Sequence, residues 1–347
     1  MKLMEILAGI AVTCSTADGN MEITGISYDS RQVKQGDLFV AITGYAADGH
    51  RFIPMAVEKG AAAVLCERAP EIDIPYVQVE NARLAMALAS ANFFGHPADA
   101  MTFVGITGTN GKTSSTYLLK TVLEKTLGAK VGLIGTIQNM IGDQVLETER
   151  TTPESFELQK LFYEMKQAGC THVIMEVSSH SLVLDRVAGI RFQVGVFTNL
   201  TQDHLDFHKT MEEYRKAKAI LFRRCAIGVF NGDDEATPKI LETATCKPMT
   251  FGEKPENDLQ AVAPILHSDG VEFTARYGER RAHVHLGIPG AFTVYNALGV
   301  LGAALALGVS LEDAAAALET AHGVKGRVEV VPTPGKDYTI LIDYAHA

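Results

Sequence analysis

Short apolar runs alternate with longer segments of helical spacing along the first part of the chain. Runs at 37–42, 62–66 and 76–79 predict strands, and segments at 52–59 and 82–94 predict helices. Gly60 ends the first of these helices, and Gly95-His96-Pro97 ends the second. The pattern therefore predicts a small α/β unit over residues 1–97, with its boundary at this Gly-His-Pro tripeptide.

From residue 98 strand and helix alternate regularly, which predicts a parallel sheet flanked by helices. Between about 251 and 290 turn-forming residues separate alternating strands, which predicts an antiparallel excursion within the same central domain, 98–332. Thr210 with Glu213, and Ser310, are expected to cap helices. The expected strands are 101–107, 130–137, 172–177, 194–199 and 338–343, and the expected helices are 114–127, one that opens with Pro153 as its first residue, 211–222 and 294–307.

Composition and charge narrow the class of protein. The chain has 347 residues, 47% of them hydrophobic and 21% charged, which is ordinary for a globular protein with more than one domain. A net charge of −10 argues against a general nucleic-acid or anionic-membrane partner. The five cysteines are scattered, which favours free thiols in a reducing compartment. With no apolar stretch long enough to span a bilayer, the sequence predicts a cytoplasmic protein.

A glycine-rich loop, Gly108-Thr109-Asn110-Gly111-Lys112-Thr113, lies between an expected strand and an expected helix. Such a loop can surround phosphate oxygens with backbone N–H groups, and the helix N-terminus adds a positive dipole end. Lys112 can reach the outer phosphates, and the Thr113 hydroxyl suits Mg²⁺. The spacing departs from the usual phosphate loop, because Ile106 stands where a glycine is expected. A simple tight turn is the alternative interpretation.

Two neighbouring strand ends carry polar side chains. Glu176 ends one strand, and His204 follows the next, with Asp203 beside it to orient the imidazole. The carboxyl ends of strands in a doubly wound sheet are where ligands bind. Glu176 is therefore a candidate magnesium ligand, with a surface salt bridge as its alternative. His204 could ligate a metal, orient a phosphate or cap the loop.

Lys218 lies within the apolar stripe of the expected helix 211–222. A buried ammonium group is costly unless it is paired or neutralised. One interpretation is that its methylene stem extends to the surface. The other is that it is carbamylated and becomes an anionic magnesium ligand. The spacing alone leaves both open.

These motifs occur in order along the chain, and together they resemble a known family. They are Gly-Thr-Asn-Gly-Lys-Thr at 108–113, Thr-Thr-Pro at 151–153, Met-Glu-Val-Ser-Ser-His at 175–180, Asp-His-Leu-Asp at 203–206, and Lys218. With Asp-Ser-Arg at 29–31 and Asp-Gly-His at 48–50, the series resembles the Mur ligases of peptidoglycan synthesis, in particular the UDP-N-acetylmuramoyl-tripeptide synthetases. The resemblance covers essentially the whole chain. It implies an α/β fold with a small N-terminal uridine-nucleotide-binding domain and a central ATPase-like domain.

The resemblance also implies roles for particular residues. Catalysis would involve Lys112, Glu176, His204 and Lys218. Two Mg²⁺ ions would be held by Thr113, Glu176, His204 and carbamylated Lys218. ATP would contact Gly108, Thr109, Asn110, Gly111, Lys112, Thr113, Ser114, Asn296, Arg327 and Asp343, and UDP-MurNAc-dipeptide would contact Ser30, Thr151, Thr152, Ser178 and Arg186.

The implied reaction is an ATP-dependent amide ligation through an acyl phosphate. It would add a diamino acid, meso-2,6-diaminopimelate or alternatively L-lysine, to UDP-MurNAc-L-alanyl-D-glutamate, and the enzyme would act as a monomer. The family has a third domain that selects the amino acid, and residues 333–347 are expected to begin the hinge to it. We therefore expect the chain to lack that domain and to show little turnover alone.

The other interpretations of the sequence are another Mur ligase or a folylpolyglutamate synthetase, a module that binds the substrates without turnover, and a phosphate-loop GTPase or kinase. The last is disfavoured because the chain has no Asn-Lys-x-Asp motif.

Overall fold

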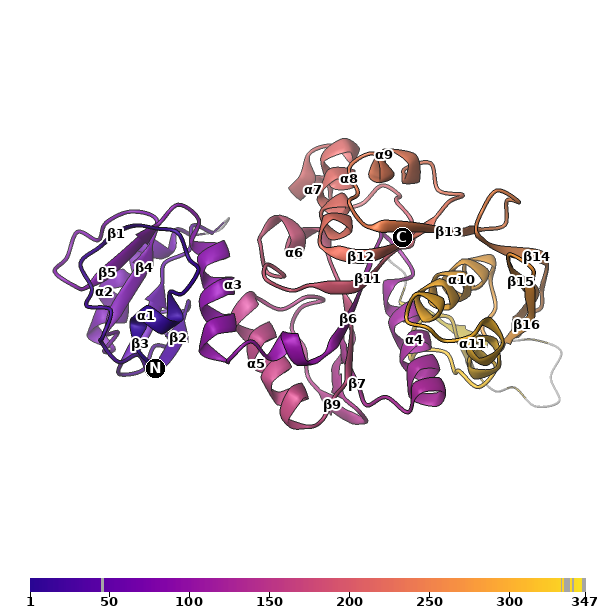
Figure 1. Cartoon of the computed structure of the whole chain (residues 1–347), viewed down its shortest axis with the longest axis horizontal. Coiled ribbons are helices and arrows are strands. Elements are labelled where there is room, and N and C mark those ends of the chain that lie inside the picture. Colours follow the sequence, from indigo (N-terminus) through magenta and orange to yellow (C-terminus); the bar gives the residue numbers. More distant parts are fainter. Residues whose placement is uncertain (45–46, 332, 334–337, 339, 345–347) are drawn as a thin grey trace. The chain divides into compact units, whose positions relative to one another are not determined.

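The computed structural model describes residues 1–44, 47–331, 333, 338 and 340–344. The chain folds into two compact units, shown within the whole chain in Figure 1 and described separately here. The first unit comprises Met1–Ala100, Pro153–Lys166 and Val183–Gly189, and the second comprises Met101–Thr152, Gln167–Leu182 and Ile190–Ala347. The expected domain limits at 97 and 332 stay predictions, and much of the expected hinge at 333–347 lies outside the described residues.

A five-stranded sheet in the order β1-β5-β4-β3-β2 forms the centre of the first unit. Its strands are β1 (Val12–Ser15), β2 (Gly25–Ser27), β3 (Asp37–Val40), β4 (Ala63–Cys66) and β5 (Tyr76–Val79). Strands β2 to β5 pair in parallel, and β1 is antiparallel to β5. Because side chains alternate along a strand, Leu38 and Val40 pack into one apolar cluster and Phe39 into another. The three strands expected in this unit are confirmed.

Short helices accompany this sheet. They are α1 (Leu3–Ile6), α2 (Ile53–Glu58) and α3 (Ala82–Phe93), with 3-10 turns η1 (Gly49–Phe52) and η2 (Pro97–Ala100). Helix α3 is capped by the Asn81 side chain, which accepts a hydrogen bond from the Leu84 N–H. Ala82, Ala85, Met86 and Ala89 of α3 enter the same apolar cluster as Leu38. The expected helices at 52–59 and 82–94 are therefore confirmed.

Helix α5 (Ser155–Gln167) belongs largely to the first unit, although it follows strands of the second in the sequence. Glu157 accepts a hydrogen bond from the Tyr28 hydroxyl at 2.9 Å. Glu154 forms ion pairs with Arg83 at 3.3 Å and with Arg186 at 2.8 Å. The expectation that Pro153 is the first residue of this helix is wrong, because the helix begins at Ser155.

The second unit is built on an 11-stranded sheet in the order β16-β15-β14-β13-β12-β11-β6-β10-β7-β8-β9. The parallel strands are β6 (Thr102–Thr107), β7 (Val131–Ile134), β10 (His172–Glu176), β11 (Phe192–Phe197), β12 (Cys225–Asn231) and β13 (Lys247–Gly252). Antiparallel additions extend both edges: β8 (Asn139–Ile141) and β9 (Gln144–Leu146), and β14 (Leu259–Leu266), β15 (Val271–Tyr277) and β16 (Arg280–Leu286). The antiparallel excursion is confirmed, but it begins with β15 pairing to β14, because β13 and β14 are still parallel.

Helices cover both faces of this sheet. On one face α4 (Lys112–Leu127), α10 (Ala291–Ala306) and α11 (Leu311–Leu318) pack against one another, as Figure 1 shows. On the other face η3 (Ile220–Arg223) places Leu221 against the strands at Gly105 and Gly195, where a Cβ would lie 3.1 and 3.3 Å from its side chain. The remaining helices are α6 (Ser179–Val183), α7 (Leu205–His208), α8 (Met211–Ala219) and α9 (Thr237–Leu241). The Thr210 and Ser310 caps are confirmed.

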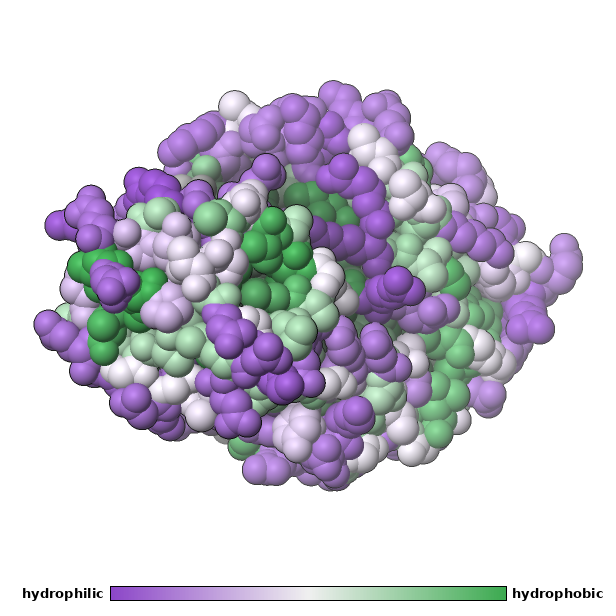
Figure 2. Space-filling view, turned by 60° about the vertical axis from the view of Figure 1, so that its left-hand side comes forward, coloured by the Kyte–Doolittle hydropathy of each residue, from purple (hydrophilic) through white to green (hydrophobic). Residues whose placement is uncertain are grey.

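Two further strands, β17 (Glu329–Val331) and β18 (Ile340–Ile342), form a separate antiparallel pair. Strand β18 lies within the strand expected at 338–343, of which residue 339 lies outside the described residues. The molecular surface intersperses hydrophilic and hydrophobic residues on the face shown in Figure 2. None of the helices in the described residues is long and apolar enough to cross a membrane.

The core of the second unit should respond strongly to truncation of Leu298. Leu298 on α10 is fully buried, whereas Leu266 on β14 is 54% exposed. Because a buried leucine loses both its transfer free energy and its packing, Leu298→Ala should lower the free energy of unfolding by about 2–5 kcal/mol. Leu266→Ala should change it by less than about 0.5 kcal/mol. Urea unfolding of both variants tests this, and equal losses would contradict it.

Candidate functional site

A pocket of about 240 Å³ lies where the parallel strands of the second unit end. Gly108 follows β6, Thr136 follows β7, Glu176 is the last residue of β10, and His204 comes after β11. The carboxyl ends of parallel strands meet at one edge of a sheet, and this edge is the usual ligand position in open α/β folds. The pocket is lined by Gly108, Thr109, Asn110, Gly111, Lys112, Thr113, Ser114, Thr136, Thr151, Glu176, Ser178, Ser179, Asp203, His204, Tyr214, Lys218 and Arg327.

The loop into α4 requires glycine at two positions. Gly108 has φ of +152°, and a Cβ there would overlap the Thr198 hydroxyl. Gly111 has φ of +85°, and a Cβ there would overlap Asn296 Oδ1. Positive φ and close neighbours together exclude larger residues at both places. The interpretation of this segment as a simple tight turn does not explain why two neighbouring segments press against it.

Hydrogen bonds tie the loop to the segment after β11. The Thr109 N–H donates to the Asn199 carbonyl at 2.9 Å, and the Asn110 N–H donates to Asn199 Oδ1 at 2.9 Å. The Thr198 hydroxyl donates to the Asn110 carbonyl at 2.6 Å. Two amides of the loop are thus already engaged. The first amides of α4, from Lys112 onward, have no acceptor within their own helix and remain for an anion.

Two lysine ammonium groups converge on one backbone oxygen. Lys112 Nζ donates to the Gly108 carbonyl at 2.9 Å and to the Thr109 carbonyl at 2.8 Å. Lys218 Nζ donates to the same Gly108 carbonyl at 2.8 Å and lies 4.2 Å from the centre of the Tyr214 ring. The cation–ring contact and the shared carbonyl partly compensate the lost hydration of Lys218.

Burial determines the chemistry of these two lysines. Lys218 is 1% exposed, so the interpretation that its stem reaches the surface is wrong. Burial lowers the pKa of Lys218 well below its usual value, and the neighbouring Lys112 lowers it further. Burial also lowers the pKa of Lys112, with Glu176 acting in the opposite direction. Lys218 can therefore lose its proton far more easily than a surface lysine.

Glu176 is buried at the centre of an oxygen-rich cluster. Its Oε1 accepts hydrogen bonds from the Thr113 hydroxyl and from the Thr136 N–H, both at 2.9 Å. Its Oε2 accepts from the Thr136 hydroxyl at 3.0 Å. A carboxylate beside a threonine hydroxyl is a donor set that suits Mg²⁺, which prefers oxygen ligands. The alternative of a surface salt bridge is wrong, because Glu176 is 1% exposed.

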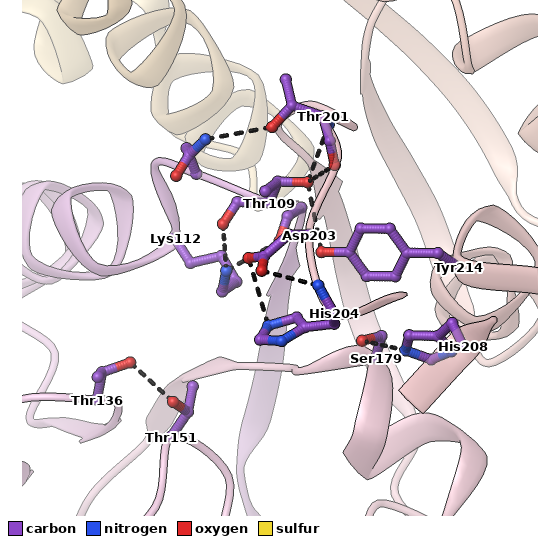
Figure 3. Close-up of polar contacts among 12 residues, drawn as sticks. Thr109, Lys112, Thr136, Thr151, Ser179, Thr201, Asp203, His204, His208 and Tyr214 are labelled. Atoms are coloured by element: carbon purple, nitrogen blue, oxygen red, sulfur yellow. Dashed lines mark hydrogen bonds and ion pairs between the residues drawn. The ribbon is translucent and has the colours of Figure 1, made fainter. Parts of the chain in front are cut away.

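His204 sits on a strained backbone. Its φ is +52°, which is uncommon for a residue other than glycine and occurs often at functional sites. Its N–H donates to Asp203 Oδ1 at 2.8 Å, and its Nε2 lies 3.5 Å from Asp203 Oδ2 (Figure 3). Among the residues that the structure describes, no three His, Cys, Asp or Glu side chains are grouped as a metal cluster. His204 with an unmodified Lys218 does not make a magnesium site.

The predicted substrate-binding residues of the second unit lie beside Glu176. Thr151 lines the pocket, and its hydroxyl is 3.0 Å from the Thr136 hydroxyl. Thr152 is buried: its hydroxyl donates to the Glu176 carbonyl at 2.8 Å and accepts from the Ser178 N–H at 3.2 Å. Thr152 therefore holds two neighbouring backbone groups in place, and Ser178 itself lines the pocket.

Other predicted residues lie elsewhere. Asn296 lines a second pocket of about 410 Å³, which shares Asn110 and Gly111 with the first. Asp343 is exposed and does not line the first pocket. Ser30 and Arg186 belong to the first unit, where the Ser30 hydroxyl contacts Met55 Sδ at 3.3 Å and Arg186 pairs with Glu154.

Sequence reasoning missed three residues that line the pocket. Thr136 could have been found, because it follows a predicted strand just as Glu176 does. Tyr214 was counted only as part of an apolar stripe, yet its hydroxyl lies 3.4 Å from the Thr109 hydroxyl. The Ser179 hydroxyl lies 2.8 Å from Nε2 of the buried His208 (Figure 3), and nothing in the sequence spacing indicated that contact.

The chain is similar to known proteins in sequence and in fold. The Mur ligase middle domain family matches residues 106–304, and the Mur ligase catalytic domain family matches residues 22–96. The UDP-N-acetylmuramoyl-L-alanyl-D-glutamate–2,6-diaminopimelate ligase 1 of Clostridium acetobutylicum is 47% identical over 349 residues, covering 100% of this chain and 72% of the relative. The ligase of the same description from Clostridium tetani is 45% identical over 353 residues, with the same coverage. A solved structure of a UDP-N-acetylmuramoyl-L-alanyl-D-glutamate–2,6-diaminopimelate ligase has a TM-score of 0.88 at 26% identity, covering 100% of this chain and 71% of that one.

Substitution of Gly108 should impair phosphate binding. Because an added Cβ meets Thr198, Gly108→Ala should displace the loop and weaken ATP binding at least about tenfold, or about 1.4 kcal/mol. Gly128→Ala is the matched control: Gly128 also has positive φ, +61°, but a Cβ there meets nothing within 4 Å. Isothermal titration with ATP measures both. Equal affinity of the Gly108→Ala variant and the unaltered chain would contradict the assignment of the loop.

Proposed function

Because the chain belongs to the Mur ligase family, we propose that it joins meso-2,6-diaminopimelate to UDP-N-acetylmuramoyl-L-alanyl-D-glutamate at the expense of ATP. The relatives that carry this description are 40–47% identical, and the chain spans about 72% of the length of the first of them. The observation that carries the proposal is the convergence of Lys112, Glu176 and Lys218 on one pocket. L-lysine as the added amino acid is the alternative.

The reaction has two steps. In the first, an oxygen of the substrate carboxylate attacks the γ-phosphorus of ATP, and the bond to ADP breaks, which gives an acyl phosphate. In the second, the amine attacks the acyl carbon, phosphate leaves, and the nitrogen loses a proton. Lys112 and the first amides of α4 would bind the phosphates and stabilise the charge that develops during transfer.

Mg²⁺ fits the oxygen donors around Glu176. Thr113 and Glu176 would hold one ion, and His204 with a carbamylated Lys218 would hold a second. When bound, such ions offset the negative charge of the phosphoryl group. Neighbouring residues orient the Glu176 carboxylate. Thr136 donates two hydrogen bonds to it, and the Thr152 hydroxyl holds the Glu176 carbonyl and the Ser178 N–H in place.

Carbamylation would make Lys218 a suitable metal ligand. The neutral amine attacks carbon dioxide, a nitrogen–carbon bond forms, and a proton passes to water, which leaves an anionic carbamate. This step requires the unprotonated amine, and burial lowers the pKa of Lys218 in that direction. The new negative charge would also be attracted to the neighbouring Lys112, instead of the two groups repelling each other.

The remaining assignments follow the same family resemblance. Thr151, Thr152, Ser178 and Arg186 would contact the UDP-MurNAc-dipeptide, with Ser30 near its uridine end. Asn296, Arg327 and Asp343 would contact the nucleotide, and Asn296 is supported by the pocket that it shares with the loop. We further propose a monomer that works in the cytoplasm without a nucleic-acid or membrane partner, which is consistent with its net charge of −10.

The first step can be tested without the amino acid. We expect the chain to yield a hydroxamate when it is incubated with ATP, Mg²⁺, UDP-MurNAc-L-alanyl-D-glutamate and hydroxylamine, because hydroxylamine traps acyl phosphates. Glu176→Gln should reduce its formation by about 10²-fold. Glu164→Gln, at a glutamate whose side chain is 45% exposed on α5, is the matched control and should change nothing.

The identity of whatever product forms then decides between the two amino acids. Because little turnover is expected, reactions that contain equal diaminopimelate and L-lysine are run long enough for trace product to be detected by mass spectrometry, and that product should be the diaminopimelate adduct. A lysine adduct would favour the alternative. Binding of both substrates without hydroxamate would favour a module that binds without turnover, and no binding of the UDP-MurNAc-dipeptide at millimolar concentration would remove the assignment.

Carbamylation of Lys218 predicts a signal from labelled carbon dioxide. With ¹³C-bicarbonate the chain should show a carbamate carbon resonance that Lys218→Ala lacks. Lys216→Ala should keep it, because the Lys216 side chain on the same helix is 57% exposed. The signal should disappear as the pH falls, since protonation of the amine removes the nucleophile. A signal that persists in Lys218→Ala would contradict the assignment.

A further inference from the structure

Two cysteines lie together at the end of the sheet opposite to the phosphate loop. Cys225 is the first residue of β12, and Cys246 immediately precedes Lys247, the first residue of β13. These strands are parallel neighbours, and Ile227 is opposite Lys247. Extending this register by two residues places Cys225 opposite Thr245, one residue before Cys246. Cys225 is the first residue of its strand and Cys246 lies just before its own strand, so the alternation of side chains inside a strand does not apply to them. With strands ~4.8 Å apart and a rise of ~3.3 Å per residue, their Cα atoms are about 6 Å apart. That separation lies within the range of disulfides.

Both sulfur atoms approach the same face of the sheet. Gly195 and Gly228 are opposite each other on β11 and β12, so their Cα–Hα positions point to one face. A Cβ at Gly195 would lie 3.0 Å from Cys225 Sγ, and a Cβ at Gly228 would lie 2.6 Å from Cys246 Sγ. Because Gly195 and Gly228 have no side chains, there is room on this face for the two thiols.

The two thiols contact each other directly. This contact lowers the pKa of Cys246 and, together with burial, raises the pKa of Cys225. A sulfenic acid on either sulfur therefore lies within reach of the other thiol, which resolves it to a disulfide. Both residues are partly exposed, and Cys225 lines a pocket of about 460 Å³ together with Arg191 and Arg223, through which a small oxidant can enter.

We propose that Cys225 and Cys246 form a reversible dithiol–disulfide site that responds to peroxides. One of the two thiols loses its proton, and its thiolate attacks one oxygen of hydrogen peroxide. The O–O bond breaks, a sulfenic acid forms, and the hydroxide that leaves takes up that proton as water. The other sulfur then attacks the sulfenic sulfur, its proton is lost, and hydroxide leaves as a second water. Two thiols are oxidised and one peroxide is reduced to two waters, and a dithiol reductant reverses the change.

The other cysteines lack this arrangement. Cys14 is exposed on the first unit, and its thiol lies beside the Tyr76 hydroxyl. Cys66 and Cys170 are buried, and burial raises the pKa of Cys66 to about 11 and also raises that of Cys170. Raised pKa values make thiols slow to oxidise. Cys66 and Cys170 therefore serve as internal controls for the oxidation of Cys225 and Cys246.

Peptide mapping of the unaltered chain tests the proposal. After limited hydrogen peroxide, free thiols are blocked with N-ethylmaleimide and the chain is digested with trypsin, which cleaves at Lys239 between the two cysteines. The expected product is a Cys225–Cys246 linked peptide that has lost two hydrogen atoms, that forms before Cys66 or Cys170 reacts, and that dithiothreitol separates. Recovery of both cysteines as maleimide adducts while Cys14 is oxidised would overturn the proposal.

Single variants trap the sulfenic acid. In Cys225→Ser or Cys246→Ser the sulfenic acid on the remaining cysteine has no resolving partner and should be trapped by dimedone, whereas Cys14→Ser, the matched control, should still form the linked peptide. Absence of a dimedone adduct at the remaining cysteine in both variants would contradict the proposed sulfenic acid. Circular dichroism of each variant checks that it is folded, and the mapping of the unaltered chain does not depend on any variant.

Discussion

Two lysine side chains share one peptide oxygen in the second unit of this chain. Lys112 and Lys218 both donate to the Gly108 carbonyl, and they arrive from helices on opposite faces of the sheet. It is unfavourable for two ammonium groups this close and this deeply buried both to stay protonated, and the pKa of the more buried Lys218 is lowered as a result. An anionic phosphate or a carbamate at this place would offset the repulsion between the two lysines.

The parallel sheet makes this convergence possible. In register, Glu176 on β10 lies opposite Ile106 on β6, and Phe197 on β11 lies opposite Thr107, so the polar residues that follow each strand emerge at one level. The antiparallel strands at the edges carry none of the pocket residues. Those at one edge, β14, β15 and β16, pack against α10 and α11. The sheet therefore positions the pocket, and the residues at and just beyond the strand ends provide its functional groups.

Much of this could be predicted from the sequence, and the failures have physical causes. The phosphate loop and Glu176 were predicted because their signals are local: glycines between a strand and a helix, and a carboxylate at a strand end. Lys218 was left between two interpretations because its partner, Gly108, is 110 residues away. The start of α5 and its place in the first unit were missed for a related reason. A helical pattern shows that a face is apolar, but not what it packs against.

The hydrogen bonds between the loop and Asn199 have a kinetic consequence. Because Thr109 and Asn110 are fastened to the next strand end before any ligand arrives, the loop does not need to be ordered when a nucleotide binds. The conformational entropy has been lost during folding instead of during binding. Association at this loop is then governed by diffusion and by displacement of water, and a slow ordering phase should have no part in it.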